Sequence, residues 1–127
     1  MVNNNKIKDL NELANIINDQ RLQGKKVAHS HGVFDLLHLG HIRHFEEAKS
    51  LADILIVTVT PDEYVNKGPH RPAFTHEIRV EALAALDVVD YVAVNRWPLS
   101  VDTILLLNPD FYVKGPDYSI TQDDITG

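Results

Sequence analysis

Apolar residues recur along the chain with two distinct periods, and these periods predict where helices and strands lie. In residues 9–19 the apolar positions return every three or four residues, which predicts an amphipathic helix. Asp9 and Glu12 stand at the spacing of a capping box at its start, with aspartate in the place of serine or threonine. Residues 53–60 are apolar at almost every position, a pattern typical of a parallel strand that is covered on both faces. We expect this strand to lie in the middle of a sheet.

Helix and strand patterns alternate through the rest of the chain. Apolar spacing predicts helices over residues 41–52, 76–86 and 100–107, and shorter runs predict strands over residues 25–34, 90–94 and 110–115. The segment 65–74 is rich in glycine, proline and basic residues and is expected to form a loop, after which Thr75 can cap a helix. Strands separated by helices imply right-handed βαβ units, so we expect an α/β fold with a sheet of four or five strands.

The composition narrows the kinds of protein that this chain can be. With 127 residues, of which 44% are hydrophobic, it can bury one core, so we expect one domain over residues 1–127 with the helix of residues 1–24 packed on it. The net charge of -6 and the pI near 5.5 argue against broad binding of nucleic acid or of an acidic membrane. Cysteine is absent and no apolar stretch reaches about 18 residues, so we expect a cytoplasmic protein without disulfides.

Three histidines are crowded into the segment GVFDLLHLGHIRHF, residues 32–45, directly behind a predicted strand. In an open parallel sheet, ligands bind beyond the carboxyl ends of the strands where the strand order reverses, and this segment falls at such an end. If a helix starts near His41, its first backbone N–H groups and its dipole face the same crevice as the rings of His38 and His41. The sequence therefore predicts an anion site, although the two common glycine-loop phosphate motifs do not occur.

The residues alone are compatible with two further roles for these polar side chains. Histidines at positions i and i+3 of a helix can share a zinc ion, although His38 precedes the predicted helix and Asp35 is the one other ligand nearby. The histidines can also be solvated or hydrogen-bonded within the fold, which is what we expect for His44. In the preceding strand, burial of His29 and His31 costs free energy unless hydrogen-bond partners satisfy them or they lie at the open end of the sheet.

Three motifs together resemble the cytidylyltransferase-like nucleotidyltransferases. The H-x-G-H element of that family matches residues 38–41, the K-G-x-x-R-P loop of its sugar-phosphate adenylyltransferases matches residues 67–72, and their V-K-G-G-D-Y segment matches residues 113–118. Arg79 stands where those proteins carry an arginine in the next helix. The likeness runs from about residue 25 to residue 127 and is strongest to the heptose-phosphate adenylyltransferases and the glycerol-phosphate cytidylyltransferases.

This resemblance implies a Rossmann-like, three-layer α/β/α fold with a mostly parallel sheet of about five strands, so that residues 1–127 form a nucleotidyltransferase domain. It implies transfer of a nucleoside monophosphate from ATP or CTP, with ATP favoured, to a phosphorylated sugar or alcohol with release of pyrophosphate. A phosphomonoester is largely ionised at pH 7, so the nucleophile needs no protein base. Mg²⁺ would accompany the triphosphate through phosphate and water, with no protein ligand implied. The resembling enzymes commonly form homodimers.

The resemblance also assigns roles to individual residues. The catalytic residues that it implies are His38, His41, Lys67 and Arg79. The nucleotide-binding residues that it implies are Gly32, Val33, Phe34, Asp35, Gly40, Arg71, Lys114, Gly115 and Asp117. Five of these have a plain structural alternative. Gly40 and Asp35 can be turn residues, and Lys67 and Arg71 can be solvated loop charges. Arg79 can form a surface ion pair with Glu77 or Glu81.

Two departures from the family pattern bear on activity. Enzymes of this group carry a helix-starting motif rich in serine and threonine downstream of V-K-G-x-D-Y, and we expect this domain to lack it, because the chain reads DDITG after that segment. Pro116 replaces the usual second glycine and removes a backbone donor. A non-catalytic nucleotide-binding module, or a fragment of a larger enzyme, is therefore the main alternative. Class I aminoacyl-tRNA synthetases also use H-x-G-H, but no K-M-S-K-S-like stretch or basic face is present.

Overall fold

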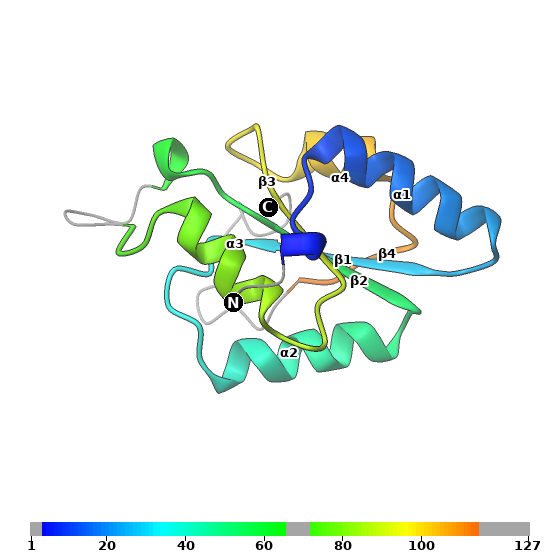
Figure 1. Cartoon of the computed structure of the whole chain (residues 1–127), viewed down its shortest axis with the longest axis horizontal. Coiled ribbons are helices and arrows are strands. Elements are labelled where there is room, and N and C mark those ends of the chain that lie inside the picture. Colours follow the sequence, from blue (N-terminus) through cyan, green and yellow to red (C-terminus); the bar gives the residue numbers. More distant parts are fainter. Residues whose placement is uncertain (1–3, 66–71, 115–127) are drawn as a thin grey trace.

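The computed structural model describes residues 4–65 and 72–114, which form a parallel sheet between two layers of helices (Figure 1). The strands are β1 (Val27–Gly32), β2 (Ile54–Val59), β3 (Tyr91–Val94) and β4 (Phe111–Tyr112). The helices are α1 (Leu10–Leu22), α2 (Leu39–Ser50), α3 (His76–Ala84) and α4 (Val101–Leu107), with short 3-10 helices η1 (Asn4–Lys6) and η2 (Asp62–Tyr64). The predicted α/β fold is confirmed, with four strands in the described residues where about five were expected.

The strand order is β3-β2-β1-β4, and it reverses between β1 and β4. From β1 the chain runs through α2 to β2 and through α3 to β3, with both helices on one face of the sheet. It then crosses the other face as α4, beside α1, and returns as β4 on the free side of β1 (Figure 1). The carboxyl ends of β1 and β4 therefore flank the kind of switch point at which open α/β sheets bind ligands.

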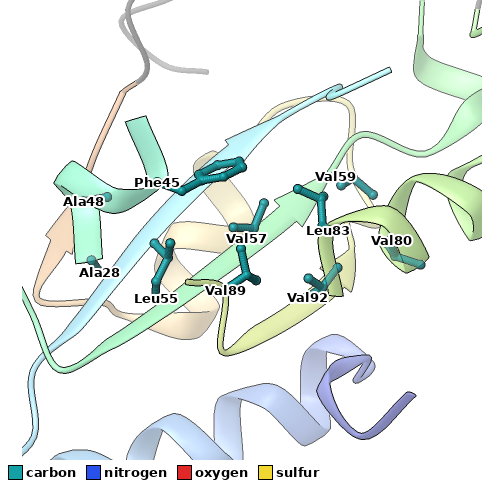
Figure 2. Close-up of a cluster of buried hydrophobic side chains, with 10 residues drawn as sticks. All are labelled: Ala28, Phe45, Ala48, Leu55, Val57, Val59, Val80, Leu83, Val89 and Val92. Atoms are coloured by element: carbon teal, nitrogen blue, oxygen red, sulfur yellow. The ribbon is translucent and has the colours of Figure 1, made fainter. Parts of the chain in front are cut away.

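A hydrophobic cluster on each face joins the helices to the sheet. On the face of α2 and α3, Phe45 and Leu83 are fully buried against β2, and Figure 2 shows them reaching toward Leu55 and Val57 from opposite sides. The other face is closed by α1 and α4, through Leu10, Leu13, Ile17 and Leu107. All six residues of β2 are buried, which confirms the predicted central strand. Within the described ranges, no helix has the length and apolar character that crossing a membrane requires.

Local capping signals set most helix boundaries. The Asp9 carboxylate accepts the backbone N–H of Glu12 at 2.8 Å and Thr75 accepts that of Ile78 at 3.4 Å, so both predicted caps are confirmed. At the end of α4, Asn108 adopts a left-handed conformation with φ 47° directly before Pro109. The start of α2 differs from the prediction: the helix begins at Leu39, two residues before His41, because His38 is its N-cap.

Candidate functional site

The candidate site lies at the carboxyl edge of the sheet, where β1 leads through a short connection into α2. The register pairs His29 of β1 with Tyr112 of β4. When this parallel register is continued by two residues, Lys114 stands level with His31. Lys114 is exposed. The end of β1, the start of α2 and the lysine after β4 therefore share one edge, as the sequence predicts.

His38 and His41 cap the start of α2 reciprocally. The Nδ1 atom of His38 accepts the backbone N–H of Gly40 at 3.0 Å, and Nδ1 of His41 accepts the backbone N–H of His38 at 3.2 Å. The two ring centroids lie 4.1 Å apart with 41° between the planes. The predicted proximity of these two histidines is therefore present.

These hydrogen bonds define what the two rings can offer to a ligand. A neutral imidazole carries one proton, and because Nδ1 is the acceptor in each ring, the proton resides on Nε2. Each ring can then donate one hydrogen bond through Nε2–H. The structure differs from the prediction in one respect. The backbone N–H groups of His38 and Gly40 do not face a ligand, because they donate to the two imidazoles. The helix dipole still favours an anion at this end.

Phe34 holds the connection between β1 and α2 against the helix. Its φ of 52° is in the left-handed region, which is rare for a bulky residue and is strained unless its surroundings hold it. Its ring lies edge-on to His41 at 5.6 Å and to Phe45 at 5.2 Å. A Cβ atom on Gly32 would come within 2.9 Å of the Phe34 ring, so the absence of a side chain at Gly32 gives this ring its place. The Phe34 ring in turn packs against His41.

Asp35 and Arg79 join the same connection to the start of α3. The Asp35 carboxylate accepts the backbone N–H groups of Ala73 at 2.7 Å and Phe74 at 2.9 Å. The Arg79 guanidinium donates through three nitrogens, Nε to the carbonyl of Phe74 at 3.1 Å, Nη1 to that of Val33 at 2.8 Å, and Nη2 to Asp62 at 2.7 Å. Arg79 is only 2% exposed, so the alternative of a surface ion pair with a glutamate of α3 is wrong.

The described residues bring no third potential metal ligand into a group with His38 and His41. His44 is buried, its Nε2 atom lies 3.0 Å from the hydroxyl of Ser30, and burial lowers its pKa, so it is hydrogen-bonded within the fold as expected. In the described parts of the chain, three potential ligands come within 4.8 Å of one another at Asp62, His76 and Glu77. This group includes neither His38 nor His41, so it gives the zinc alternative no support.

A second group of polar side chains crosses the interior of the sheet on the face of α1 and α4. Thr58 Oγ1 lies 2.8 Å from His29 Nε2 and 2.8 Å from His31 Nδ1. His31 Nε2 is 3.4 Å from the hydroxyl of Thr60. Desolvation by burial lowers the pKa of His29 to about 3 and that of His31 to about 4, so both rings are neutral at pH 7. The polar side chains of β1 thus each have at least one hydrogen-bond partner, whereas Nδ1 of His29 has none among the described residues.

Some predicted site residues cannot be placed, and others were missed. Lys67, Arg71, Gly115 and Asp117 lie outside the described residues. Neither Thr58 nor Thr60 was among the predicted site residues, and no role was predicted for His31. A signal was present in the sequence, because polar residues stand two apart at 29 and 31 in β1, and at 58 in β2 and 60 directly after it.

Comparison with known proteins adds independent evidence. Residues 30–125 match the family model described as Cytidylyltransferase-like. Among curated proteins, the chain is 44% identical over 117 residues to the bifunctional protein HldE of Citrifermentans bemidjiense, a match that covers 91% of this chain and 24% of that protein. It is 40% identical over 124 residues to the bifunctional protein HldE of Geobacter sulfurreducens, covering 96% of this chain and 25% of that protein. The chain thus spans about a quarter of the length of these relatives.

A solved structure supports the same architecture. The lipopolysaccharide core biosynthesis protein of Thermoplasma volcanium superposes with a TM-score of 0.65 at 25% sequence identity. The superposition covers 76% of this chain and the whole of that protein. The family match includes the last three residues of β1, the H-x-G-H element and both later motifs.

Proposed function

The chain belongs to the cytidylyltransferase-like family, and from this premise we propose that it is a nucleotidyltransferase. It transfers the nucleoside monophosphate of ATP or CTP to the phosphate of a sugar or alcohol and releases pyrophosphate. The observation that carries the proposal is the reciprocal capping of His38 and His41 at the start of α2. It directs Nδ1 of each ring to the backbone and places the proton of each neutral ring on Nε2, with the two ring centroids 4.1 Å apart at the helix end where the dipole favours an anion.

The reaction suits a site without a general base. A phosphate oxygen of the acceptor attacks the α-phosphorus of the nucleotide, and one P–O bond forms as the bond between the α-phosphorus and the bridging oxygen to the β-phosphorus breaks. The acceptor phosphate is mostly ionised at pH 7, because its second pKa is about 6. The protein must therefore align the reactants and stabilise the charge that moves onto the pyrophosphate.

The residues divide into those that contact the phosphates and those that position them. His38 and His41 donate to phosphate oxygens through Nε2–H, and Lys67 and Arg71 supply positive charge. Gly32, Val33, Phe34, Asp35 and Gly40 shape the nucleotide site, and Lys114, Gly115 and Asp117 also contribute to nucleotide binding. Arg79 has a different role from the phosphate clamp that the resemblance implies. Its contacts with Val33, Phe74 and Asp62 support a positioning role, in which it holds the connection ahead of His38.

A divalent metal enters with the nucleotide, as enzymes of this family generally use one, and we take it to be Mg²⁺. Both carboxylate oxygens of Asp35 already accept backbone N–H groups. The metal would be held chiefly by triphosphate oxygens and water, an arrangement that Mg²⁺ favours, and would neutralise charge on the phosphates. In this form the metal–nucleotide complex is the substrate.

Adenylyl transfer to a sugar phosphate is the form of the reaction that the motifs favour, because K-G-x-x-R-P and V-K-G-x-D-Y resemble the sugar-phosphate adenylyltransferases. The matched relatives are named bifunctional, and the chain corresponds to a quarter of their length. A chain of this length can carry one of the two activities that the name bifunctional implies for those relatives. On the two motifs we place ATP ahead of CTP as the donor.

The test is release of pyrophosphate by the purified chain with Mg²⁺, ATP or CTP, and a panel of sugar 1-phosphates, glycerol phosphate and sugar 6-phosphates. We expect pyrophosphate with ATP and at least one sugar phosphate, together with a product that retains the label of [α-³²P]ATP. A folded chain that binds ATP in calorimetry but releases no pyrophosphate with any pair would overturn the enzymatic proposal. That outcome would identify the chain as a binding module.

A further inference from the structure

The hydrogen bonds of His29, Thr58 and His31 form a chain that runs from the interior of the sheet to its carboxyl edge. Val27 and Ile56 pack in the cluster beneath α1 and α4, and side chains alternate along a strand, so His29, His31 and Thr58 lie on that same face. His29 is completely buried, with its ring 5.2 Å from that of Tyr112. His31, two residues further along β1, is only partly buried and pairs in register with Thr58.

The single hydroxyl of Thr58 restricts where the protons of this chain can be. Thr58 Oγ1 contacts both rings, but it has one proton, so it donates to one ring and accepts from the other. In one arrangement Thr58 donates to His31 Nδ1 and accepts from His29 Nε2–H. In the reverse arrangement it donates to His29 Nε2, and the proton of His29 must then reside on Nδ1.

The surroundings of His29 decide between the two arrangements. Its Nδ1 atom is buried with no hydrogen-bond partner among the described residues. A buried N–H without an acceptor is rarer in proteins than a buried acceptor without a donor, so Nδ1 is the unprotonated nitrogen. His29 therefore donates through Nε2–H, Thr58 donates to His31 Nδ1, and the proton of His31 resides on Nε2.

We infer that His31 is a further substrate-binding residue of the site and that its Nε2–H donates a hydrogen bond to a hydroxyl oxygen of a bound sugar. Thr58 is the positioning residue that keeps this proton on Nε2. The substrate part of this inference rests on the proposed function. The contact of His31 Nε2 with Thr60, at 3.4 Å, is the longest of the chain, so a ligand oxygen can replace or share it. The side chain of Thr60 is itself buried at the end of β2.

The Nε2–H donor of His31 suits an uncharged oxygen of a ligand. The ring lies on the face of α1 and α4, whereas His38 and His41 belong to α2 on the opposite face of the sheet. A substrate whose phosphates lie at the start of α2 would extend its sugar across the edge toward His31. Burial keeps His31 neutral, so it lacks the positive charge that favours phosphate. Both the ribose of the nucleotide and a sugar acceptor carry hydroxyl groups, and the experiment separates the two.

The first arm of the test measures protonation in the free protein and needs no turnover. In a long-range ¹H–¹⁵N spectrum of the imidazoles, with the His31 signals assigned by their loss in His31→Phe, we expect the Nε2–H tautomer. Thr58→Val removes the hydroxyl at nearly constant volume and should give a measurable Nδ1–H population, whereas Thr58→Ser should keep the wild-type pattern. Thr103→Val is the matched control, because it deletes another buried hydroxyl on this face. An Nδ1–H tautomer in the wild type, or no change in Thr58→Val, would overturn the assignment.

The second arm measures KM separately for the nucleotide and for the acceptor. Loss of one hydrogen bond to an uncharged group predicts a rise of about 3- to 10-fold in KM for one substrate in His31→Phe, with kcat changed less. Recovery in His31→Gln, which restores a donor, would support the contact. A rise for the nucleotide assigns the ribose and a rise for the acceptor assigns its sugar. Unchanged KM values in an active His31→Phe variant would refute the substrate contact. An inactive wild type would instead refute the proposed function, and the tautomer result would still hold.

Discussion

His38 and His41 hold each other in place: the backbone N–H of His38 donates to Nδ1 of His41 at 3.2 Å, and the two imidazole centroids lie 4.1 Å apart. His41 thus combines a local structural contact with a ring nitrogen that can donate to a ligand. Since its capping contact is a single hydrogen bond and its proposed chemical contact is with a phosphate in the transition state, substitution should affect activity far more than stability.

We predict that His41→Ala lowers the rate of pyrophosphate release by about 10²-fold or more, as removal of a transition-state donor does in other enzymes. The free energy of unfolding should fall by no more than about 1–2 kcal/mol, the usual range for loss of a cap. Arg43→Ala, at an exposed position of the same helix, serves as the control and should leave both quantities near wild type. Global unfolding of His41→Ala would instead assign the residue a structural role.

Arg79 is predicted to be a stability determinant. Arg79→Met keeps much of the side-chain volume but leaves the Asp62 carboxylate and the carbonyls of Val33 and Phe74 without their donor. The Asp62 side chain is 34% exposed, so the larger cost comes from the two carbonyls that lose a buried donor, and the free energy of unfolding should fall by about 3 kcal/mol in urea denaturation. Arg43→Met is the matched control on an exposed surface. A loss below about 0.5 kcal/mol would show that Arg79 does not hold this connection.

The helices could be predicted because their apolar positions are periodic, and the central strand because it is apolar at almost every position. Leu10, Leu13 and Ile17 are all buried at the spacing expected from the sequence, and β2 is buried throughout. The start of α2 was placed two residues late for a chemical reason. Histidine is not among the side chains that usually cap helices, so a search for Ser, Thr, Asp or Asn passes over His38.

The candidate site was predictable only where its residues are close in sequence. His38, Gly40 and His41 make their contacts within three residues, so the motif contains the geometry. Arg79 bonds a carbonyl 46 residues away, and Thr58 meets residues of β1 only because β1 and β2 pair in a particular register. Such contacts depend on how the strands align, which the apolar pattern of a fully buried strand does not specify.

Phe45 should matter to stability alone. Its side chain is fully buried between α2 and the sheet (Figure 2), and Phe45→Ala should lower the free energy of unfolding by about 3–5 kcal/mol through lost burial and a cavity. Leu105→Ala is the control, since Leu105 is 74% exposed on α4 and should change stability little. A variant that is destabilised by less than about 1 kcal/mol would contradict the packing described for this face.

Acid should destabilise the fold through His29, whose pKa is about 3 in the folded protein against 6.5 for the ordinary side chain. In the unfolded chain this histidine takes up a proton below pH 6.5, whereas in the folded protein it stays neutral down to about pH 3. The unfolded state therefore binds more protons between these values, and stability falls as the pH falls through that window. From about pH 7 to about pH 5, His29 alone should lower the free energy of unfolding by about 2 kcal/mol. His31 and His44, whose pKa values are also lowered, act in the same direction.

The contribution of His29 can be separated from those of the other titrating groups by comparing the wild type with His29→Phe. The substituted ring can keep the aromatic contact with Tyr112 but takes up no proton. Urea denaturation at about pH 7, 6 and 5 should show a shallower loss of stability in the variant, by about 1 kcal/mol per pH unit near pH 5 to 6, which corresponds to nearly one proton fewer bound on unfolding. Parallel curves for the two proteins would mean that His29 titrates normally in the fold. In that case its ring would be accessible to water and could not be the buried end of a hydrogen-bond chain that runs to His31.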